Sequence, residues 1–561
     1  MRQRFLNMLA LVGFFSFVGC AAEDGLSDDP SGDDELITFS AVQEGTATKA
    51  EISQSDSKVI NWSTGDAITV YDGGGNSVRF GLTEGAGGTR ASFSGKITQT
   101  AESYLALSPY QGGTFSDDGK IQFVTMKAKQ TAVAGSFDPE AALMVSKTAP
   151  GGTSMSFRNV VGYVKVTPQF DCDMISLISE DSSDLLAGTV SIDYNNGEPV
   201  VTVSDDGTNS VSISGDIVAG KTYYIAVLPG TLKSGFRLVF FAKDGKDAVK
   251  STSKSLEIKR NTVINLGSVN STALTQIPYV TFTADAEQIF KMSLCDGITS
   301  LQYSVNNAPW QDIVSNKEIV FGGSDGSLRL RGMSALGTAI KSYASGSTEV
   351  YSSIKFGKKN VYVSCAGDIR TLVDYSNHEN AKTDRARFCY LFIRCANLLS
   401  TPDLPAMTLA DDCYYAMFSG CTGLTTAPDL PATTLADYCY YVMFSNCKGL
   451  TTAPDLPAMT MATGCYCSMF SNCTGLTSAP VLPATTLNTD CYWSMFSGCT
   501  NLRLVRIGAL KVPIKITNGN KITAFDGWLD QCAAKGIIRK PSALTLPSSA
   551  VPSGWSVVDY D

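Results

Sequence analysis

The hydrophobic residues of this chain follow two patterns, and the first runs from about residue 37 to residue 269. Apolar and polar residues alternate there in short runs, such as Ala67 to Tyr71 and Ser103 to Leu107, with Gly, Asp and Asn between the runs. Alternation with period two is typical of strands that bury one face, so this stretch predicts antiparallel β-sandwiches. Its length exceeds one small sandwich, and we expect two, with a seam at Thr167 and Pro168.

The second pattern is a repeat with a step of 26 residues, between residues 388 and 502. The phrase Cys-Tyr-x-x-Met-Phe-Ser-x-Cys-x-x-Leu begins at Cys413, Cys439, Cys465 and Cys491. A fixed period of this length predicts a solenoid, in which each repeat buries its apolar face only against its neighbours.

The spacing inside one repeat indicates its local structure. Cys413, Met417 and Cys421 are four residues apart, as are Tyr414 and Phe418. On a helix these residues form one apolar stripe, so the spacing predicts one or two helical turns. The following stretch, residues 424–430, contains Pro and is rich in Thr, which favours an extended rung. Helix and rung together predict α/β coils in a chain that is otherwise mainly β.

These rungs and short helices resemble a leucine-rich repeat. The Cys before each Leu-x-x-Ala rung occupies the position where leucine-rich repeats carry Asn or Cys. Over about Cys365 to Cys532 the chain resembles the BspA-like group of bacterial surface leucine-rich repeats. This resemblance implies a leucine-rich-repeat solenoid at the cell surface.

The N-terminus has the pattern of a secretion signal. Arg2 and Arg4 precede an apolar run that is too short to be a stable membrane anchor. The run ends in Gly19 and Cys20, which resembles a bacterial lipobox and implies cleavage before Cys20 and acylation of its thiol, for example with palmitate. An ordinary signal peptide followed by a chance Cys is the alternative. The acidic residues 21–35 that follow predict an extended tether.

Several short pieces of the alternating region resemble the fimbrillin-like (Mfa-like) proteins. The pieces are Ile37–Ser40, Thr48–Ala50, Trp62–Val70, Phe157–Asn159, Tyr224–Pro229 and Ile258–Thr262. This resemblance implies tandem transthyretin-like β-sandwiches in a surface lipoprotein, and many family members are subunits or tip proteins of type V pili. It also implies proteolytic maturation after a basic residue, and Lys49 is the matching position. An ordinary exposed Lys between strands remains open as the alternative.

Together these features divide the chain into consecutive segments. We expect a lipoprotein signal peptide at 1–19, an acidic tether at 20–36, fimbrillin-like β-sandwiches at 37–168 and 169–275, a small β domain that caps the solenoid at 276–387, leucine-rich repeats at 388–502 and a C-terminal cap at 503–561. The second cap is expected because the end of a solenoid otherwise exposes its core.

The residues that enzymes and metal sites require are sparse. The single histidine, His378, lies among Asn and Glu residues, and we expect it in a solvated loop. Zinc sites with two imidazoles are excluded, and a Ser-His-Asp or Cys-His mechanism would have to use His378. No phosphate-binding Gly-rich loop is present. We therefore expect no enzyme activity, no cofactor and no metal.

The 16 cysteines do not have metal-ligand spacing. Those in the repeats are eight residues apart within a repeat and 26 apart between repeats. Equivalent residues of a solenoid form columns and do not converge on one ion. We expect a ladder of small buried free thiols, and disulfides between neighbouring coils are the alternative.

The positions that vary between repeats indicate which surface is free to bind. Tyr415, Tyr441 and Trp493 belong to one variable column, and aromatic side chains at a surface stack on sugars or anchor protein partners. We select this column as one candidate ligand face and the rung residues Asp429 and Asp455 as the other. An aromatic side chain that only shields its own helix is the alternative.

The net charge of −9 and the pI near 4.9 argue against nucleic acid and anionic membrane surfaces as partners. Our interpretation is a lipoprotein of the outer membrane: a surface-anchored adhesin, or a tip or accessory subunit of a type V pilus. Its expected partners are a host or matrix protein or a glycan, and pilus subunits by donor-strand exchange. A surface lipoprotein that captures glycans or nutrients without assembling is the first alternative, and a glycoside hydrolase in residues 279–380 is the second.

Overall fold

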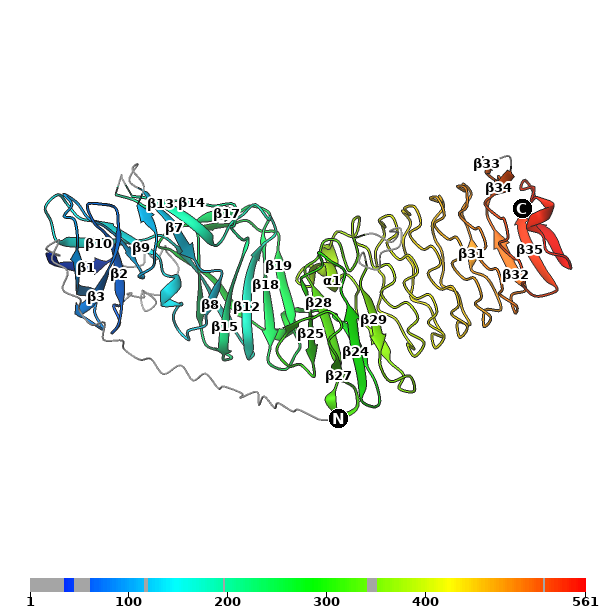
Figure 1. The fold of residues 1–561 in the computed structure, drawn as a ribbon, viewed down its shortest axis with the longest axis horizontal. Coiled ribbons are helices and arrows are strands. Elements are labelled where there is room, and N and C mark those ends of the chain that lie inside the picture. Colours follow the sequence, from blue (N-terminus) through cyan, green and yellow to red (C-terminus); the bar gives the residue numbers. More distant parts are fainter. Residues whose placement is uncertain are drawn as a thin grey trace, which may run out of the picture.

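The computed structural model describes residues 35–44, 61–115, 120–194, 197–340, 351–517 and 520–560. These residues form a long, mainly β molecule, with β1 (Glu35–Gln43) near one end and β36 (Trp555–Tyr560) at the other (Figure 1). Within the described ranges, the one α-helix is α1 (Thr371–Asp374). The predicted predominance of strands is therefore confirmed.

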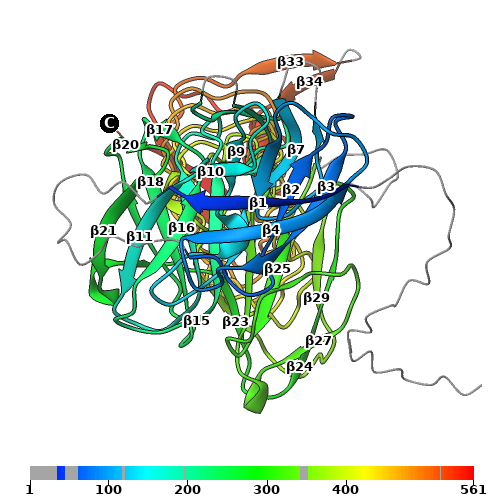
Figure 2. The same cartoon turned by 90° about the vertical axis from the view of Figure 1, so that its left-hand side faces the viewer.

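The first unit is a closed barrel. Its seven strands neighbour one another in the order β1, β10 (Ser154–Asn159), β9 (Met144–Lys147), β5 (Leu105–Ser108), β2 (Ala67–Tyr71), β3 (Ser77–Glu84) and β4 (Arg90–Ile97). β1 pairs antiparallel with β4 and parallel with β10, and Figure 2 shows β1 and β4 side by side at this end. The barrel interior holds Phe39, Trp62 and Phe93, each at most 2% exposed. The strand predicted from Ala67 to Tyr71 matches β2.

A second set of sheets encloses a separate core. It contains the sheet β22-β19-β18-β12-β15-β8 and the sheet β16-β11-β21, with the smaller sheets β14-β13-β7-β6 and β17-β20. The strands of these four sheets are β6 (Thr114–Phe115), β7 (Lys120–Met126), β8 (Lys129–Thr131), β11 (Gly162–Pro168), β12 (Cys172–Ser179), β13 (Gly188–Asp193), β14 (Val200–Val203), β15 (Ser210–Ile217), β16 (Tyr223–Val227), β17 (Gly230–Leu232), β18 (Phe236–Ala242), β19 (Ala248–Thr252), β20 (Leu256–Ile258), β21 (Val263–Val269) and β22 (Thr275–Gln276). Thr167 and Pro168, the expected seam, lie inside β11.

A third set of strands joins the second unit to the repeats. The sheet β26-β25-β28-β23-β30 contains β26 (Gln311–Asp312), β25 (Leu301–Val305), β28 (Leu328–Gly332), β23 (Val280–Thr283) and β30 (Ser364–Ala366), and the sheet β27-β24-β29 contains β27 (Ile319–Phe321), β24 (Gln288–Ser293) and β29 (Ser353–Phe356). One continuous apolar core extends from Val280 in β23 to Trp555 in β36. The β segment and the repeats therefore share an interior.

Buried arginines hold the second unit to the third. The guanidinium of Arg331 in β28 lies 4.8 Å from the ring centroid of Phe241, 4.3 Å from that of Trp310 and 4.4 Å from that of Tyr375. Arg237 of β18 also pairs across the junction with Asp374, at an N–O distance of 3.3 Å. Cations against aromatic faces are attracted most strongly where water is excluded, so this contact favours a rigid junction.

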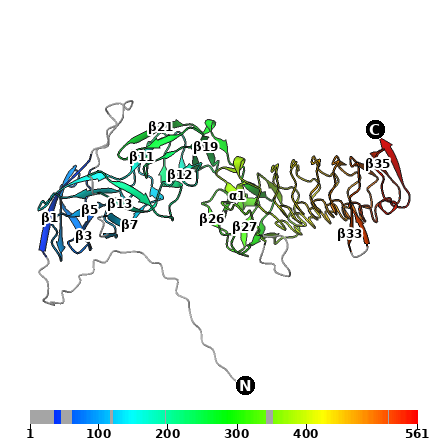
Figure 3. The same ribbon diagram turned by 90° about the horizontal axis from the view of Figure 1, so that it is seen from above.

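The repeats form a regular stack of coils in line with the third unit (Figure 3). The predicted helical turns are wrong. Among the described residues 388–502, none is helical, and Asp412, Ala416 and Gly420 have positive φ angles of 60°, 52° and 79°. Each positive φ reverses the local curvature, so the backbone is a series of tight turns that repeats every four residues. This repeat returns the side chains to one face, which is why the apolar stripe is nevertheless buried.

Successive backbone N–H groups donate alternately within their own coil and to the next coil, which explains why the coils are turns and not helices. The N–H of Tyr415 donates to the carbonyl of Asp412 within its own coil, at 3.2 Å. The neighbouring N–H groups of Tyr414 and Ala416 instead donate to Cys439 and Tyr441 in the next coil, at 2.8 and 2.9 Å. Because the next coil accepts half of these hydrogen bonds, the stack satisfies its buried backbone without an α-helix.

The stack ends in a small parallel sheet. Its strands are β31 (Val481–Leu482), β32 (Leu504–Ile507), β35 (Gly536–Pro541) and β36, in that order, and the hairpin of β33 (Ile514–Thr517) and β34 (Asn520–Thr523) lies beside it. Earlier coils contribute single parallel bridges, such as Thr426 to Thr452. The extended rungs are thus short along most of the stack and lengthen into strands at its end.

Candidate ligand-binding face

Two columns of aromatic rings fill the interior of the stack. Phe418 stacks on Phe444 at a centroid distance of 5.7 Å, and Tyr414 stacks on Tyr440 at the same distance. These side chains are at most 2% exposed. Most residues that recur unchanged between repeats are therefore interior, as predicted, and these are not available to a ligand.

The thiols are also interior. All the cysteines that the structure describes are free, and those at the repeat positions are buried. Burial raises the pKa of the Cys447 thiol to about 12. The predicted ladder of free thiols is the arrangement found, and such groups are poor nucleophiles and poor metal ligands because the thiolate is scarce. The described residues contain no group of three His, Cys, Asp or Glu side chains placed to hold a metal ion.

A ladder of tyrosines runs along the outside of the stack. The ring of Tyr351 packs against that of Tyr390 at 4.3 Å and Tyr390 against Tyr415 at 5.3 Å between centroids, both tilted, and Tyr415 stacks on Tyr441 at 4.7 Å. We call these four residues the tyrosine ladder; each side chain is half-buried. Each ring packs against its neighbour, and Tyr415 and Tyr441 cover each other's faces, so this pair presents ring edges and hydroxyl groups to solvent.

Three tyrosines of the ladder, Tyr390, Tyr415 and Tyr441, stay uncharged at neutral pH because their pKa values are raised. Burial, followed by the neighbouring phenol of Tyr390, raises the pKa of Tyr415, and burial raises the pKa of Tyr441 to about 12. Neutral phenols both donate and accept hydrogen bonds. The surface therefore combines apolar ring edges with a row of hydroxyl groups.

The structure brings together only part of the predicted aromatic column. Tyr415 and Tyr441 are adjacent, but Cys467 occupies the next coil and is 1% exposed. Trp493 lies beyond it and is 47% exposed, so the chain separates it from the ladder by one coil. Tyr390 and Tyr351 were missed because they lie outside the 26-residue register: the residue 26 before Tyr415 is Cys389.

The second predicted face is an exposed row of carboxylates. Asp429 and Asp455 occupy equivalent rung positions and are exposed, and Asp403 precedes them in the same row. Burial, and then the charges of Asp368 and Asp429, raise the pKa of Asp403. Like charges thus face one another along the row, and this surface would attract a cationic partner.

The row changes its charge toward the C-terminal end of the stack. The position equivalent to Asp455 in the next coil is Val481, which pairs with Arg506, and Arg506 pairs with Arg539. Sequence reasoning missed these arginines because the 26-residue period is lost after residue 502. The face is therefore acidic over the repeats and basic at the terminal sheet.

The prediction for His378 is wrong. This side chain is 4% exposed, and burial lowers its pKa. It belongs to a short turn, His378–Asn380, that follows α1 and lies beside Arg370, whose guanidinium donates to the carbonyl of Glu379 at 3.0 Å. Of the polar neighbours that suggested a solvated loop, Glu379 and Asn380 are exposed, whereas Asn377 donates to Glu180 and the imidazole is buried.

Two predicted sites lie outside the described residues. Cys20, the candidate lipidation site, and Lys49, the candidate cleavage site, are in ranges for which the structure makes no statement. In the part of the chain that is described, no helix has the length and hydrophobicity to cross a membrane.

No protein-family model and no curated protein matches the chain. Among solved structures, it is similar to a candidate cell adhesion protein from Bacteroides uniformis, with 15% identity, a TM-score of 0.28, and coverage of 43% of this chain and 96% of the other. A candidate cell adhesion protein from Bacteroides ovatus has 13% identity, a TM-score of 0.30, and coverage of 43% and 95%. A fimbrial protein from Bacteroides ovatus has 14% identity, a TM-score of 0.21, and coverage of 46% and 53%.

Proposed function

We propose that this protein is a surface-anchored adhesin, or a tip or accessory subunit of a type V pilus, that binds a host protein or a glycan through its repeat stack. The observation that carries this proposal is the tyrosine ladder. Its rings form a continuous strip from the third unit, at Tyr351, to the third coil, at Tyr441. A preformed aromatic strip binds with a small loss of side-chain entropy.

The binding surface in this proposal combines two chemistries. The tyrosine ladder offers ring edges and hydroxyl groups, and the carboxylate row of Asp403, Asp429 and Asp455 offers negative charge. Aromatic residues at the centre of an interface carry much of the binding energy, while charges adjust partner choice and association rate. In this proposal the tyrosines supply affinity and the carboxylates supply selectivity.

The same proposal assigns a role to each segment of the chain. Cys20 would anchor the protein to the outer membrane, residues 20–36 would act as a tether, and the two β units within residues 37–275 would hold the repeats away from the membrane. The segment at 276–387 would support the leucine-rich repeats at 388–502, and residues 503–561 would close them. The buried arginine contacts between the second and third units support this role, because a rigid stalk presents its head at a defined distance.

Assembly into a pilus would use the first barrel. β1 lies between β4 and β10, and its Phe39 side chain is completely buried in the barrel core. Cleavage at Lys49 would break the covalent link between β1 and the rest of the barrel. Loss of β1 would then expose a long apolar groove that a donor strand from another subunit fills by main-chain pairing.

The decisive experiment replaces Tyr390, Tyr415 and Tyr441 with alanine and measures adhesion of cells or purified protein to host matrix proteins and a glycan array. The matched control is Tyr362→Ala, which removes a tyrosine that is 57% exposed and lies off the ladder. We expect the triple variant to lose adhesion and the control to keep it. Wild-type adhesion by a folded triple variant would show that the ladder is not the binding face.

Imaging distinguishes this proposal from its first alternative. Antibodies against the repeats should label fibres if the protein is a pilus subunit, and separate points on the cell if it captures glycans or nutrients alone. A hydrolase screen on purified protein tests the second alternative, a glycoside hydrolase in residues 279–380. Turnover of any polysaccharide would contradict the binding role as the main function.

A further inference from the structure

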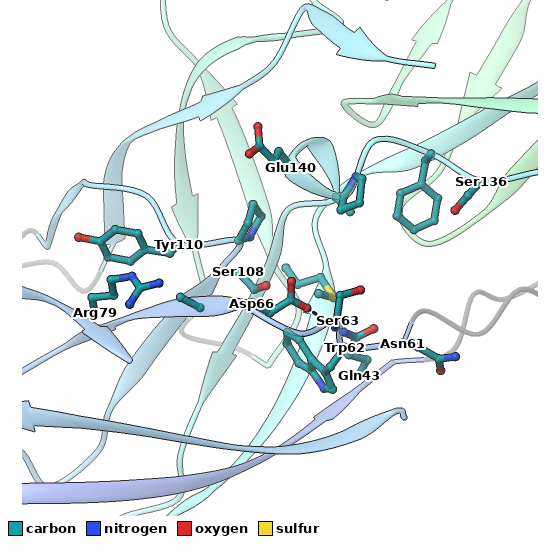
Figure 4. Close-up of a pocket in the computed structure, with 17 residues that line it drawn as sticks. Gln43, Asn61, Trp62, Ser63, Asp66, Arg79, Ser108, Tyr110, Ser136 and Glu140 are labelled. Atoms are coloured by element: carbon teal, nitrogen blue, oxygen red, sulfur yellow. Dashed lines mark hydrogen bonds between the residues drawn. The ribbon is translucent and has the colours of Figure 1, made fainter. Parts of the chain in front are cut away.

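A cavity of about 480 Å³ lies between the first barrel and the segment that leads to the second core (Figure 4). Its floor consists of buried side chains from both sides, among them Trp62 and Met144 from the barrel and Ala142 from the connecting segment. Its rim carries the exposed side chains of Arg79 and Tyr110. A buried apolar floor with a polar rim at the boundary of two cores is the usual setting of a small-molecule site.

The residues of the floor include two buried polar atoms that have no hydrogen-bond partner among the described residues, Gln43 Oε1 and Trp62 Nε1. Gln43, the last residue of β1, is 8% exposed, and its Oε1 accepts no hydrogen bond from any described residue. Figure 4 shows Gln43 beside Ser63 at the floor of the cavity. A buried acceptor without a donor is unfavourable, and native proteins seldom retain one without a use for it. A ligand that donates to Oε1 removes this cost.

The charges around the cavity balance one another. Asp66, whose Oδ2 accepts the amide N–H of Ser63 at 2.7 Å, lies on the same rim as the guanidinium of Arg79. Glu140 on the opposite rim is already paired with Lys127. Counted with Lys127, the side chains of Asp66, Arg79 and Glu140 carry no net charge, so the lining favours an uncharged ligand.

Tyr110 supplies an aromatic wall. The Arg79 guanidinium carbon lies 5.6 Å from its ring centroid, which fixes the ring at the cavity rim, and the ring is 45% exposed. An aromatic ring, a buried amide acceptor, a carboxylate and hydroxyl groups together match a sugar, which has apolar C–H faces and hydroxyl donors at its edge. The cavity volume is within the range of about 300–1,000 Å³ that is usual for small-molecule sites.

We propose that this cavity binds a neutral sugar unit, with a sugar hydroxyl donating to Gln43 Oε1 and a sugar face against Tyr110. The site lies at the barrel end of the molecule and includes Gln43 of β1, so it is present only in the chain that retains β1. It is independent of the tyrosine ladder on the repeat stack. The protein would accordingly carry two separate recognition surfaces, one at the barrel end of the rod and one along the first coils of the repeat stack.

Saturation-transfer NMR on the full chain tests the site with lactose and N,N′-diacetylchitobiose as neutral probes and sialyllactose as a charged one. We expect wild-type protein to bind at least one neutral probe at about 10 mM and to bind sialyllactose more weakly. Gln43→Met, which keeps the side-chain volume, should weaken binding about tenfold and leave the melting temperature unchanged or higher, because it removes an unsatisfied acceptor. Tyr110→Ala at the rim should also weaken binding, and Tyr362→Ala should not.

Two results would overturn the proposal. The first is that neither neutral probe binds the wild-type protein at about 10 mM. The second is that both site variants bind the probe with an affinity within about twofold of wild type. The ladder variant with alanine at Tyr390, Tyr415 and Tyr441 should retain sugar binding in this assay, so failure of the ladder and failure of the cavity are seen separately.

Discussion

The thiol of Cys447 donates a hydrogen bond to the backbone carbonyl of Phe418, one coil earlier, across an Sγ–O distance of 3.1 Å. The same contact recurs at 3.0–3.1 Å for the pairs Cys421–Phe392, Cys473–Phe444 and Cys499–Phe470. Each thiol therefore bonds to the preceding coil instead of to a second sulfur. The recurring Cys provides a side chain that is both small enough for the interior and able to donate.

This contact predicts the chemical behaviour of the repeat cysteines. Native protein should resist iodoacetamide at about pH 8, because burial raises the pKa of Cys447 to about 12 and also raises the pKa of Cys421. After denaturation without reductant, most repeat cysteines should titrate as free thiols. A count near zero, measured on protein without the acyl group, would mean that disulfides join the coils.

The interior aromatic column predicts a large loss of stability on truncation. Phe418 is fully buried between Phe392 and Phe444, at centroid distances of 5.3 and 5.7 Å. Phe418→Ala or Met417→Ala should cost about 2–5 kcal/mol, as other large-to-small core substitutions do. The exposed Thr433→Ala is the control, and urea unfolding is the measurement. A Phe418→Ala protein as stable as the control would contradict the packing described here.

Glu44 predicts a pH dependence at the boundary between the first two units. Its carboxylate accepts hydrogen bonds from Arg158 and Arg260, at 3.0 and 2.7 Å, and from the amide of Asn159. Burial acts to raise the pKa of Glu44, but these hydrogen bonds outweigh it and lower the pKa below its usual value of 4.5. Stability from this group is therefore present above about pH 4.5 and is lost as the pH falls through the lowered pKa of the folded state.

Glu44→Gln tests this dependence. The variant should unfold more easily at neutral pH, by about 1–3 kcal/mol, and its difference from wild type should shrink below about pH 4.5. Glu198→Gln is the matched control, because Glu198 contacts the same two arginines but its side chain is 57% exposed. A difference between wild type and Glu44→Gln that stays constant down to about pH 3 would argue against the ion pairs.

The lipobox resemblance predicts membrane anchoring through Cys20. Cys20→Ala should release the protein from membranes or leave an unprocessed precursor, since the acylated thiol would be the anchor. Membrane fractionation with mass spectrometry of the N-terminus checks both outcomes. Processed Cys20→Ala protein that remains in the membrane fraction would refute lipidation.

Cleavage at Lys49 predicts a second N-terminus. N-terminal sequencing of native surface protein should find a start at residue 50 if the chain matures as a pilus subunit. Lys49→Ala should abolish that start and any fibres, while Lys96→Ala, a change in β4, serves as the control. A sole start at Cys20 would favour an anchoring or non-pilus role.

Much of the candidate surface could be predicted from the sequence of the repeats, because equivalent residues recur every 26 positions. Comparison of copies separates Phe418, which recurs and is buried, from Tyr415, which varies and is half-exposed. The same comparison failed for Tyr390, because it packs against Tyr415 from outside the register, and for Trp493, because the intervening Cys467 interrupts the column. Contacts between rings depend on which residues are neighbours in space. The 26-residue period predicts these neighbours only where successive repeats have the same length and carry the same residue type.

The sequence by itself determined the period of 26, the identity of the interior columns and the alternation that forms β2, because these follow from local spacing of apolar residues. The tertiary structure decided which partner each polar group takes. The amide of Tyr414 donates to Cys439 in the next coil, so turns replace the predicted helix, and His378 points inward from a polar segment. The physical reason is that a buried hydrogen-bonding group takes the partner that folding brings to it, and this partner can be distant along the chain.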